Sequence, residues 1–172
     1  PLGDPNDIAL ELRHVSKGTC LHELNFQLRR GEILGIAGLS GHGQVELLHG
    51  LFGDGDFDTG TVEVNGKAVR LRNQREALSH GIVLIPEDRK NDGLILSRSI
   101  GENITMMCLK EIGRRGVLSR KKEENVIADA VNRMSIKVFS TLLPVSSLSG
   151  GNQQKVVIAK ALSTQARIVL LS

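Results

Sequence analysis

A glycine-rich stretch in the first quarter of the chain has the spacing of a phosphate-binding loop. Gly38 and Gly43 occupy the two fixed glycine positions of the pattern G-x-x-x-x-G-K-[ST]. In such a loop, successive backbone N–H groups point toward one place at the start of a helix, where they and the helix dipole attract an anion. The residues of this candidate site are Gly38, Leu39, Ser40, Gly41, His42, Gly43, Gln44 and Val45.

Two side chains of the phosphate-binding pattern are missing from this stretch. Gln44 stands where a lysine would neutralise the β- and γ-phosphates, and Val45 stands where a hydroxyl would hold Mg²⁺. The loss of one charged hydrogen bond costs about 1.5–3 kcal/mol, which is about one to two orders of magnitude in affinity. Spacing alone therefore leaves two interpretations open: a weakened phosphate site, or a tight strand-to-helix turn that needs glycine for close packing.

A second stretch, with the sequence LSGGNQQK, has the features of another anion pocket. Ser149 is a natural N-cap residue, and Gly150 and Gly151 leave the backbone N–H groups bare at a helix start. An ordinary Ser-Gly cap would explain the helix start but not the whole stretch. The candidate residues here are Leu148, Ser149, Gly150, Gly151, Asn152, Gln153 and Gln154.

The elements that must position these loops begin with β-strands. Apolar and polar residues alternate over 8–15 and 24–28, which predicts half-buried antiparallel strands. Asn65-Gly66 lies between two β-rich runs within 61–69 and predicts a hairpin. Residues 32–37 predict a short apolar strand that leads into the glycine loop. The helix predicted after the loop, 45–52, would carry Val45, Leu48 and Phe52 on one face.

The rest of the chain alternates between buried strands and helices. Continuous apolar runs at 81–85 and 167–171 predict buried strands. Between them, a helical pattern is clearest over 120–134, and a further helix follows the LSGG sequence. The apolar stripe of the first of these helices comprises Val126, Ile127, Ala130, Val131 and Met134. This order predicts an α/β protein with antiparallel strands, a βα unit and a helical insert.

Composition excludes several classes of function. The chain has 172 residues, a net charge of +3, and four Phe with no Trp or Tyr, which argues against a nucleic-acid platform built on base stacking. Cys20 and Cys108 are too few and too far apart for a metal site or a disulfide scaffold. A membrane helix needs about 20 apolar residues, and the apolar runs are much shorter. We therefore expect no metal ligands, no nucleic-acid partner and no membrane span.

Taken together, the motifs resemble the ATP-binding-cassette (ABC) ATPases. LSGGNQQK is similar to the signature sequence of the carbohydrate-import branch, and the sequences at 83–94 (VLIPEDRKNDGL) and 35–53 resemble the second, C-terminal cassette of its ribose, galactose, arabinose, autoinducer and nucleoside importers. The resemblance covers residues 8–171. It implies a P-loop NTPase cassette with a mixed β core, an antiparallel β subdomain and an inserted α-helical subdomain, truncated at the C-terminus.

The resemblance also implies a division of the chain. Residues 4–95 would form the β and P-loop core, 96–147 the α-helical subdomain, and 148–172 the signature helix and a final core strand of a partial cassette spanning 4–172. Residues 1–3 are interpreted as a possible remnant of a cleaved tag.

The resemblance implies a role for each loop. Residues 38–45 would contact the phosphates of ATP bound weakly at this cassette, which also lacks the family's adenine-stacking aromatic residue. Ser149 and Gly151 would reach the γ-phosphate of ATP held by a partner cassette, and Mg²⁺ would bind only with that partner. Glu87 stands at the register of the Q-loop glutamine, which senses nucleotide and meets the membrane permease.

In the family, the Mg²⁺-binding Asp and the catalytic Glu follow the strand after the signature helix. Ser172 stands at the register of that Asp, so we expect no catalytic residue within the chain and interpret it as a fragment that is inactive by itself. The implied partners are a second cassette, in the same polypeptide or as a homodimer mate, the permease subunits, and indirectly a sugar-binding protein. The implied location is cytoplasmic, on the inner face of the cell membrane.

Two other functions stay open at this stage. A non-transport ABC protein acting on ribosomes or chromosomes shares the general motifs, although PEDRK and LSGGNQQK together favour transport. An interaction domain that no longer binds nucleotide is the other alternative, because the glycine loop lacks its lysine and hydroxyl. Nothing in the sequence identifies the transported molecule.

Overall fold

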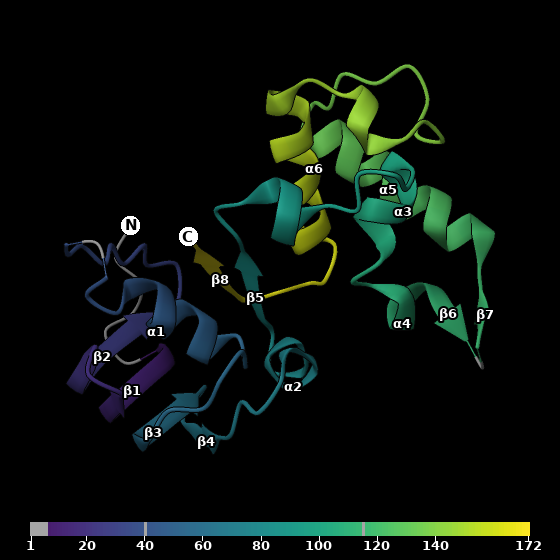
Figure 1. The fold of residues 1–172 in the computed structure, drawn as a ribbon. Coiled ribbons are helices and arrows are strands. Elements are labelled where there is room, and N and C mark those ends of the chain that lie inside the picture. The colour runs from purple at the N-terminus through teal and green to yellow at the C-terminus, as the bar shows by residue number, and fades with distance from the viewer. Residues whose placement is uncertain (1–6, 40, 115) are drawn as a thin grey trace. The chain divides into compact units, whose positions relative to one another are not determined.

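The computed structural model describes residues 7–39, 41–114 and 116–172, and these form two units (Figure 1). The first unit comprises residues 7–84 and 167–170, and the second comprises 85–166 and 171–172. The predictions for Ser40 and for a tag remnant at residues 1–3 lie outside the described residues.

The first unit contains a four-stranded antiparallel sheet with the order β2-β1-β3-β4. The strands are β1 (Ile8–Lys17), β2 (Leu21–Arg29), β3 (Thr59–Val64) and β4 (Lys67–Val69). Both predicted strands at the start of the chain are confirmed, and so is their antiparallel pairing. The predicted hairpin is confirmed as well: Asn65 and Gly66 connect β3 to β4 with φ values of 51° and 71°, as a two-residue turn of type I′ requires.

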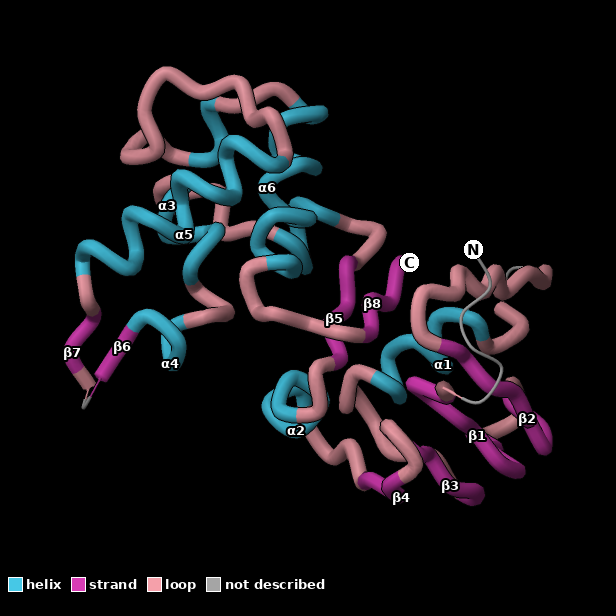
Figure 2. Tube along the Cα trace, turned by 180° about the vertical axis from the view of Figure 1, so that it is seen from behind, coloured by secondary structure: helices cyan, strands magenta, loops and turns pink. Residues whose placement is uncertain are grey.

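Helix α1 (Gln44–Leu51) follows the glycine loop, as predicted, and lies beside the β1–β2 pair in both views (Figures 1 and 2). Its predicted buried face was wrong in part. Leu47, Gly50 and Leu51 are buried, whereas Val45 is 50% exposed. The reason is the packing of Phe57: a β-carbon on Gly50 would lie 2.6 Å from its ring. Phe57 thus packs on the buried side of α1 at Gly50, whereas Val45 lies on the open side.

The strand predicted over residues 32–37 is absent: the structure has no regular element there, and Ile33 is 99% exposed. A strand exists through backbone hydrogen bonds to a neighbouring strand. In the part of the chain that the structure describes, no strand pairs with these residues. The apolar composition of residues 32–37 was therefore not enough to form a strand.

Strands β5 (Ile82–Ile85) and β8 (Ile168–Leu171) form a separate two-stranded sheet. The N–H of Ile168 donates to the carbonyl of Gly81 at 3.0 Å, and the N–H of Ser172 donates to that of Ile85 at 3.1 Å, so the strands run parallel. β5 is buried along its whole length, as predicted. β8 is buried only at every second residue, because it alternates between a covered and an open face. Helix α2 (Gln74–Ser79) precedes β5 and is capped by Asn73.

The second unit is mainly helical (Figure 2). Its helices are η1 (Arg89–Gly93, a π-helix), α3 (Ile100–Thr105), α4 (Leu109–Ile112), α5 (Arg120–Arg133), η2 (Val145–Ser147, a 3₁₀ helix) and α6 (Gly150–Leu162). Helix α3 packs against both α5 and α6. On α5, the predicted apolar stripe is confirmed: Ala130 is buried and the rest of the stripe is half-buried.

A small hairpin interrupts the helical insert and was not predicted. It consists of β6 (Gly113–Arg114) and β7 (Val117–Leu118). The strands are too short to show an alternating pattern in the sequence. Among the described residues, no helix is both long and apolar enough to cross a membrane.

The close approach of β1 to the start of β3 generates the first prediction. Gly60 has a φ of +93°, and a β-carbon there would lie 2.5 Å from the carbonyl oxygen of His14 and from Cα of Val15. Gly60→Ala therefore combines a left-handed backbone with a collision against another strand. We expect it to lower the free energy of unfolding, measured by urea denaturation, by more than the about 1–3 kcal/mol that a strained backbone costs alone.

Gly66→Ala is the matched control, because Gly66 also has a positive φ of +71° but nothing lies within 4 Å of its added β-carbon. We expect this variant to lose only about 1–2 kcal/mol. Equal losses in the two variants would show that the contact between β1 and β3 is looser than the structure has it.

Candidate nucleotide-binding and signature loops

The glycine loop is closed by its own side chains and backbone. The carbonyl of Leu39 accepts the N–H of His42 at 3.1 Å and the side-chain amide of Gln44, through Nε2, at 3.2 Å. The same amide lies so close to Gly38 that a β-carbon there would collide with it. Gln44, at the lysine position, thus bonds to the loop with a neutral group.

Gly43 is the point at which the loop becomes helix α1. It has a φ of +95°, and a β-carbon there would lie 2.6 Å from the carbonyl oxygen of Cys20 and from Cδ2 of Leu21. Its own carbonyl accepts the N–H of Leu47 at 2.8 Å, which is the first helical hydrogen bond. Only glycine fits this close approach, as the interpretation of the loop as a tight turn requires.

The phosphate interpretation also retains structural support. Helix α1 begins at Gln44 with no side-chain cap on its first-turn N–H groups, so these donors are available to an anion. Leu39, Gly41, His42 and Val45 are exposed around this helix start. The site could hold phosphate oxygens through backbone N–H groups alone.

The predicted Q-loop position, Glu87, lies at an exposed bend between β5 and η1. The next residue, Asp88, caps η1: its Oδ1 accepts the N–H of Asn91 at 3.1 Å and of Lys90 at 2.9 Å, and its Oδ2 accepts Nδ2 of Asn91 at 2.7 Å. The backbone N–H of Asn91 and then that of Lys90 lower the pKa of the Asp88 carboxyl below its usual range. The segment after Glu87 is thus held in shape by an ionised cap.

The signature loop opens helix α6, and Ser149 occupies the N-cap position as predicted. Its hydroxyl, however, makes no cap to the backbone and instead accepts Nδ2 of Asn152 at 3.3 Å. Ser149 and Gly151 are exposed, and a β-carbon on Gly151 would meet nothing within 4 Å. The start of α6 therefore presents free space beside a serine hydroxyl and uncapped backbone donors.

The remaining signature residues stabilise the loop from inside. The Oδ1 of Asn152 accepts the N–H of Lys137 at 3.1 Å, which connects the loop to the segment after α5. Gln153 is buried, and its Nε2 donates to the carbonyls of Leu148 at 3.1 Å and Val145 at 3.4 Å. Leu148 and Gln154 are half-buried. Within the motif, Ser149 and Gly151 are thus the open residues, whereas Asn152 and Gln153 hold the loop in place.

Sequence reasoning missed Lys160, which bonds to the end of η1, and Arg89 of η1, which lies beside Gly150 of α6. Lys160 is 8% exposed, and the Nε atom of Arg89 is buried. The signal for Lys160 was a basic residue in the middle of an apolar helix, between Ala159 and Ala161. A lysine is almost never fully buried without a specific partner.

The described residues do not fit a bound Mg²⁺. Within residues 7–39, 41–114 and 116–172, no group of three or more His, Cys, Asp or Glu residues is placed to hold a metal ion. Val45 brings no oxygen to the glycine loop, and Mg²⁺ prefers oxygen ligands. The position at which the pattern has a metal-binding hydroxyl thus offers no ligand to Mg²⁺.

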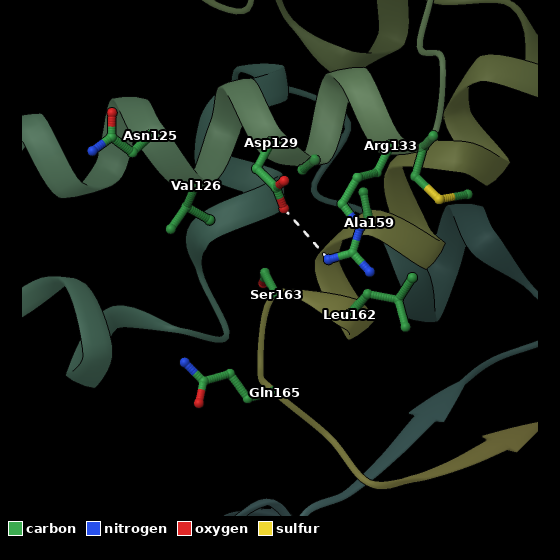
Figure 3. Close-up of a pocket in the computed structure, with 10 residues that line it drawn as sticks. Asn125, Val126, Asp129, Arg133, Ala159, Leu162, Ser163 and Gln165 are labelled. Carbon is green, nitrogen blue, oxygen red and sulfur yellow. Dashed lines mark hydrogen bonds and ion pairs between the residues drawn. The ribbon is translucent and has the colours of Figure 1, made fainter. Parts of the chain in front are cut away.

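A cavity of about 360 Å³ lies between α5 and α6 in the second unit (Figure 3). Asp129 and Arg133 form an ion pair of 3.4 Å on its wall, and Ala159 and Leu162 line it from α6. None of the predicted site residues lines it, so it is separate from both loops.

The cap of η1 generates a prediction on pH. Because the folded-state pKa of Asp88 is lowered, its contribution to stability is complete above the unfolded value of about 3.9 and is lost as pH falls through the lower folded value. We expect an NMR titration of this carboxyl to give a midpoint below about 3.9. Asn91→Ala should raise the midpoint in part, since it removes the Nδ2 donor and leaves the backbone donors. An unshifted midpoint in the unmodified protein would contradict the cap.

Comparison with known proteins identifies one family. The family described as "ABC transporter" matches residues 21–171. A "Ribose import ATP-binding protein RbsA" of Geobacillus kaustophilus is 41% identical over 162 residues, which is 94% of this chain and 33% of that protein. "Ribose import ATP-binding protein RbsA 1" of Rhizobium johnstonii is 45% identical over 165 residues, covering 95% and 32%. The chain thus spans about a third of the length of these curated relatives.

Solved structures show the same fold. cbiO1 from Clostridium perfringens, part of an ABC transporter complex, has a TM-score of 0.77 at 19% identity, over 96% of this chain and 65% of that one. An ATP-binding cassette solved as a dimer in a post-hydrolysis state with ADP and Pi has a TM-score of 0.76 at 22% identity, over 94% and 72%. These likenesses confirm the predicted α/β cassette fold. The chain belongs to the ABC transporter family.

Proposed function

We propose that the chain is the second, C-terminal cassette of the ATP-binding subunit of a ribose-type sugar importer. The observation that carries the proposal is the open start of α6, where Ser149 and Gly151 are exposed and no side chain caps the backbone. The full sequence LSGGNQQK and the relatives named as ribose import proteins support the transport role. ATP hydrolysis that drives sugar import is then the activity of the whole protein.

The glycine loop binds ATP weakly in this proposal. Backbone N–H groups at the start of α1 hold the phosphates, while Gln44 bonds to Leu39 and supplies no positive charge. Position 44 has no lysine and position 45 has no hydroxyl, and the described residues hold no cluster of metal ligands. In this proposal, Mg²⁺ therefore enters only with the partner cassette. The glycine loop is thus the impaired site of the pair.

The signature loop acts on the partner's nucleotide. A solved cassette of the same fold is a dimer with ADP and Pi, which supports a face-to-face arrangement of two cassettes. Residues that serve a ligand held by another chain must be exposed, and Ser149 and Gly151 are. The Ser149 hydroxyl and the uncapped N–H groups of α6 would donate to the γ-phosphate. The partner is a cassette of the same polypeptide or a homodimer mate.

Glu87 supplies the contact to the permease in this proposal. It is exposed at a bend, immediately before the capped helix η1. The sugar-binding protein acts indirectly through that permease, and the protein works in the cytoplasm on the inner face of the membrane. The three-part division of the chain at 95 and 147 and the inactivity of the 172 residues by themselves stay predictions.

A nucleotide titration tests the glycine loop. We expect calorimetry with ATP and Mg²⁺ to give weak binding, with a Kd near about 1 mM, equivalent to about 4 kcal/mol. The double variant Gln44→Lys/Val45→Thr should bind about 10- to 100-fold more tightly, because it restores one charged hydrogen bond and a metal-binding hydroxyl.

Gln27→Lys is the matched control, since it adds the same charge on the exposed surface of β2. It should leave the affinity for ATP unchanged. If neither the unmodified protein nor the double variant binds ATP, the loop is only a turn, and the interaction-domain alternative is favoured.

A substitution in the signature loop tests the action on the partner. Gly151→Asp fits the fold, because Gly151 has free space around its added β-carbon, but it places a negative charge beside the γ-phosphate. In the full-length protein assembled with its permease, sugar-stimulated ATP hydrolysis should fall at least about tenfold, or about 1.4 kcal/mol.

Gly151→Ala and Asn125→Asp are the controls, the first for loss of glycine and the second for added charge on the exposed side of α5. Both should retain most of the stimulated rate. Full activity of Gly151→Asp would overturn the role of this loop in trans.

A further inference from the structure

Helix α6 carries a buried lysine whose bond leads to another segment. Lys160 is 8% exposed, and its Nζ donates to the carbonyl oxygen of Gly93 at the end of η1. Burial lowers the pKa of this ammonium group. Among residues 7–39, 41–114 and 116–172, no carboxylate forms an ion pair with it.

For stability alone, an apolar side chain at this position would be more favourable than a lysine. A buried cation without a counter-charge loses its hydration on folding, which costs free energy, whereas an apolar residue of similar length has no such cost. Its neighbours Val157, Ala159 and Ala161 are all buried. The lysine is therefore best explained by the bond that it makes, which joins the middle of an apolar helix to a backbone carbonyl far along the chain.

Residues 86–94, which we call the strap, contact α6 at two places. At one end, a β-carbon on Gly93 would lie 3.0 Å from Cγ2 of Val157, so the strap backbone packs closely on the helix beside the Lys160 bond. At the other end, Nη2 of Arg89 lies 3.1 Å from the β-carbon position of Gly150, in the first turn of α6. The strap thus contacts α6 at the signature loop and again near Lys160.

These two contacts span much of the helix. Gly150 and Lys160 are separated by ten residues, or about 15 Å at the rise of an α-helix. The Asp88 cap holds η1 in its conformation between them. π-Helical turns are rare and are found frequently at functional sites. A segment that is held on a helix by one hydrogen bond and also lies against its first turn moves with that helix.

We propose that Lys160 is a positioning residue that locks the strap to α6, so that a displacement of Glu87 is delivered to the signature loop. Glu87 is exposed on the strap, and Ser149 is exposed at the start of α6, so both ends of this connection are accessible to other proteins. The inference rests on the proposed function, which assigns Glu87 to the permease contact. Arg89 lies beside Gly150 and gives the strap a second contact with α6.

Two substitutions separate the bond from the volume of the side chain. Lys160→Met keeps an unbranched chain of similar length but removes the donor, whereas Lys160→Arg keeps a cation with donors for the Gly93 carbonyl. Lys122→Met is the matched control: Lys122 also donates to a backbone carbonyl, that of Glu111 at 3.5 Å, but it is exposed on α5.

The first measurement is hydrogen exchange in the full-length protein. In Lys160→Met, exchange of the backbone amides of residues 88–93 should rise by at least about tenfold, while the amides of α6 stay protected. Lys160→Arg should restore most of the protection, and Lys122→Met should match the unmodified protein. Unchanged exchange in Lys160→Met would overturn the lock, and so would an equal rise throughout α6, because that would show a general loss of stability.

The second measurement is ATP hydrolysis by the full-length protein assembled with its permease in lipid vesicles. Lys160→Met should retain basal hydrolysis but lose most of the stimulation by the sugar-loaded binding protein, with rescue by Lys160→Arg. Faster exchange with normal stimulation would overturn the delivery of movement to the signature loop. If the unmodified protein shows no sugar-stimulated hydrolysis at all, the proposed function fails, while hydrogen exchange still decides whether the lock exists.

Discussion

The burial of α6 is the constraint on which the helical unit depends. Val156 and Val157, together with small residues at positions 159 and 161, are almost completely removed from water, and helices α3, α5 and η1 all pack against this helix. Because burial of apolar area stabilises by about 25 cal/mol per Å², the axis of α6 is set by this core. The start of the helix, with the signature loop, is thereby held in a defined place even though its own side chains are exposed.

The glycine loop depends on a different constraint, which is close approach of two backbones. Gly43 contacts the turn between β1 and β2 so tightly that only a hydrogen atom fits in place of a side chain. The carbonyl of the same residue accepts the first hydrogen bond of α1. Packing and anion binding therefore make the same demand on this position, and the presence of glycine cannot separate them. Gln44 distinguishes the two roles better than Gly43 does. Its neutral amide bonds to Leu39 and so helps to close the turn, but it brings no positive charge for an anion.

Local patterns predicted the elements whose partners lie nearby in the chain. The Asn65-Gly66 turn was correct because its conformation is dictated by two residues that tolerate a positive φ. The stripe on α5 was correct because helical period alone brings its members together. For residues 32–37 the local pattern was wrong: their apolar sequence predicted a strand, but strand formation needs a hydrogen-bonded neighbour. The prediction for Val45 failed for a similar reason: which side of α1 faces inward depends on neighbours that the helix itself does not contain, such as Phe57, which packs against Gly50.

By itself, the sequence determined the family, the positions of the two loops and most of the elements around them, because motif spacing and hydrophobic period are properties of the chain. Only the tertiary structure decided which motif residues are exposed: Ser149 and Gly151 are open, whereas Gln153 is buried and bonds to the preceding turn. It also revealed Lys160 as a bond between α6 and the strap. The two partners of that bond are far apart in sequence, so their contact depends on packing that no local pattern records.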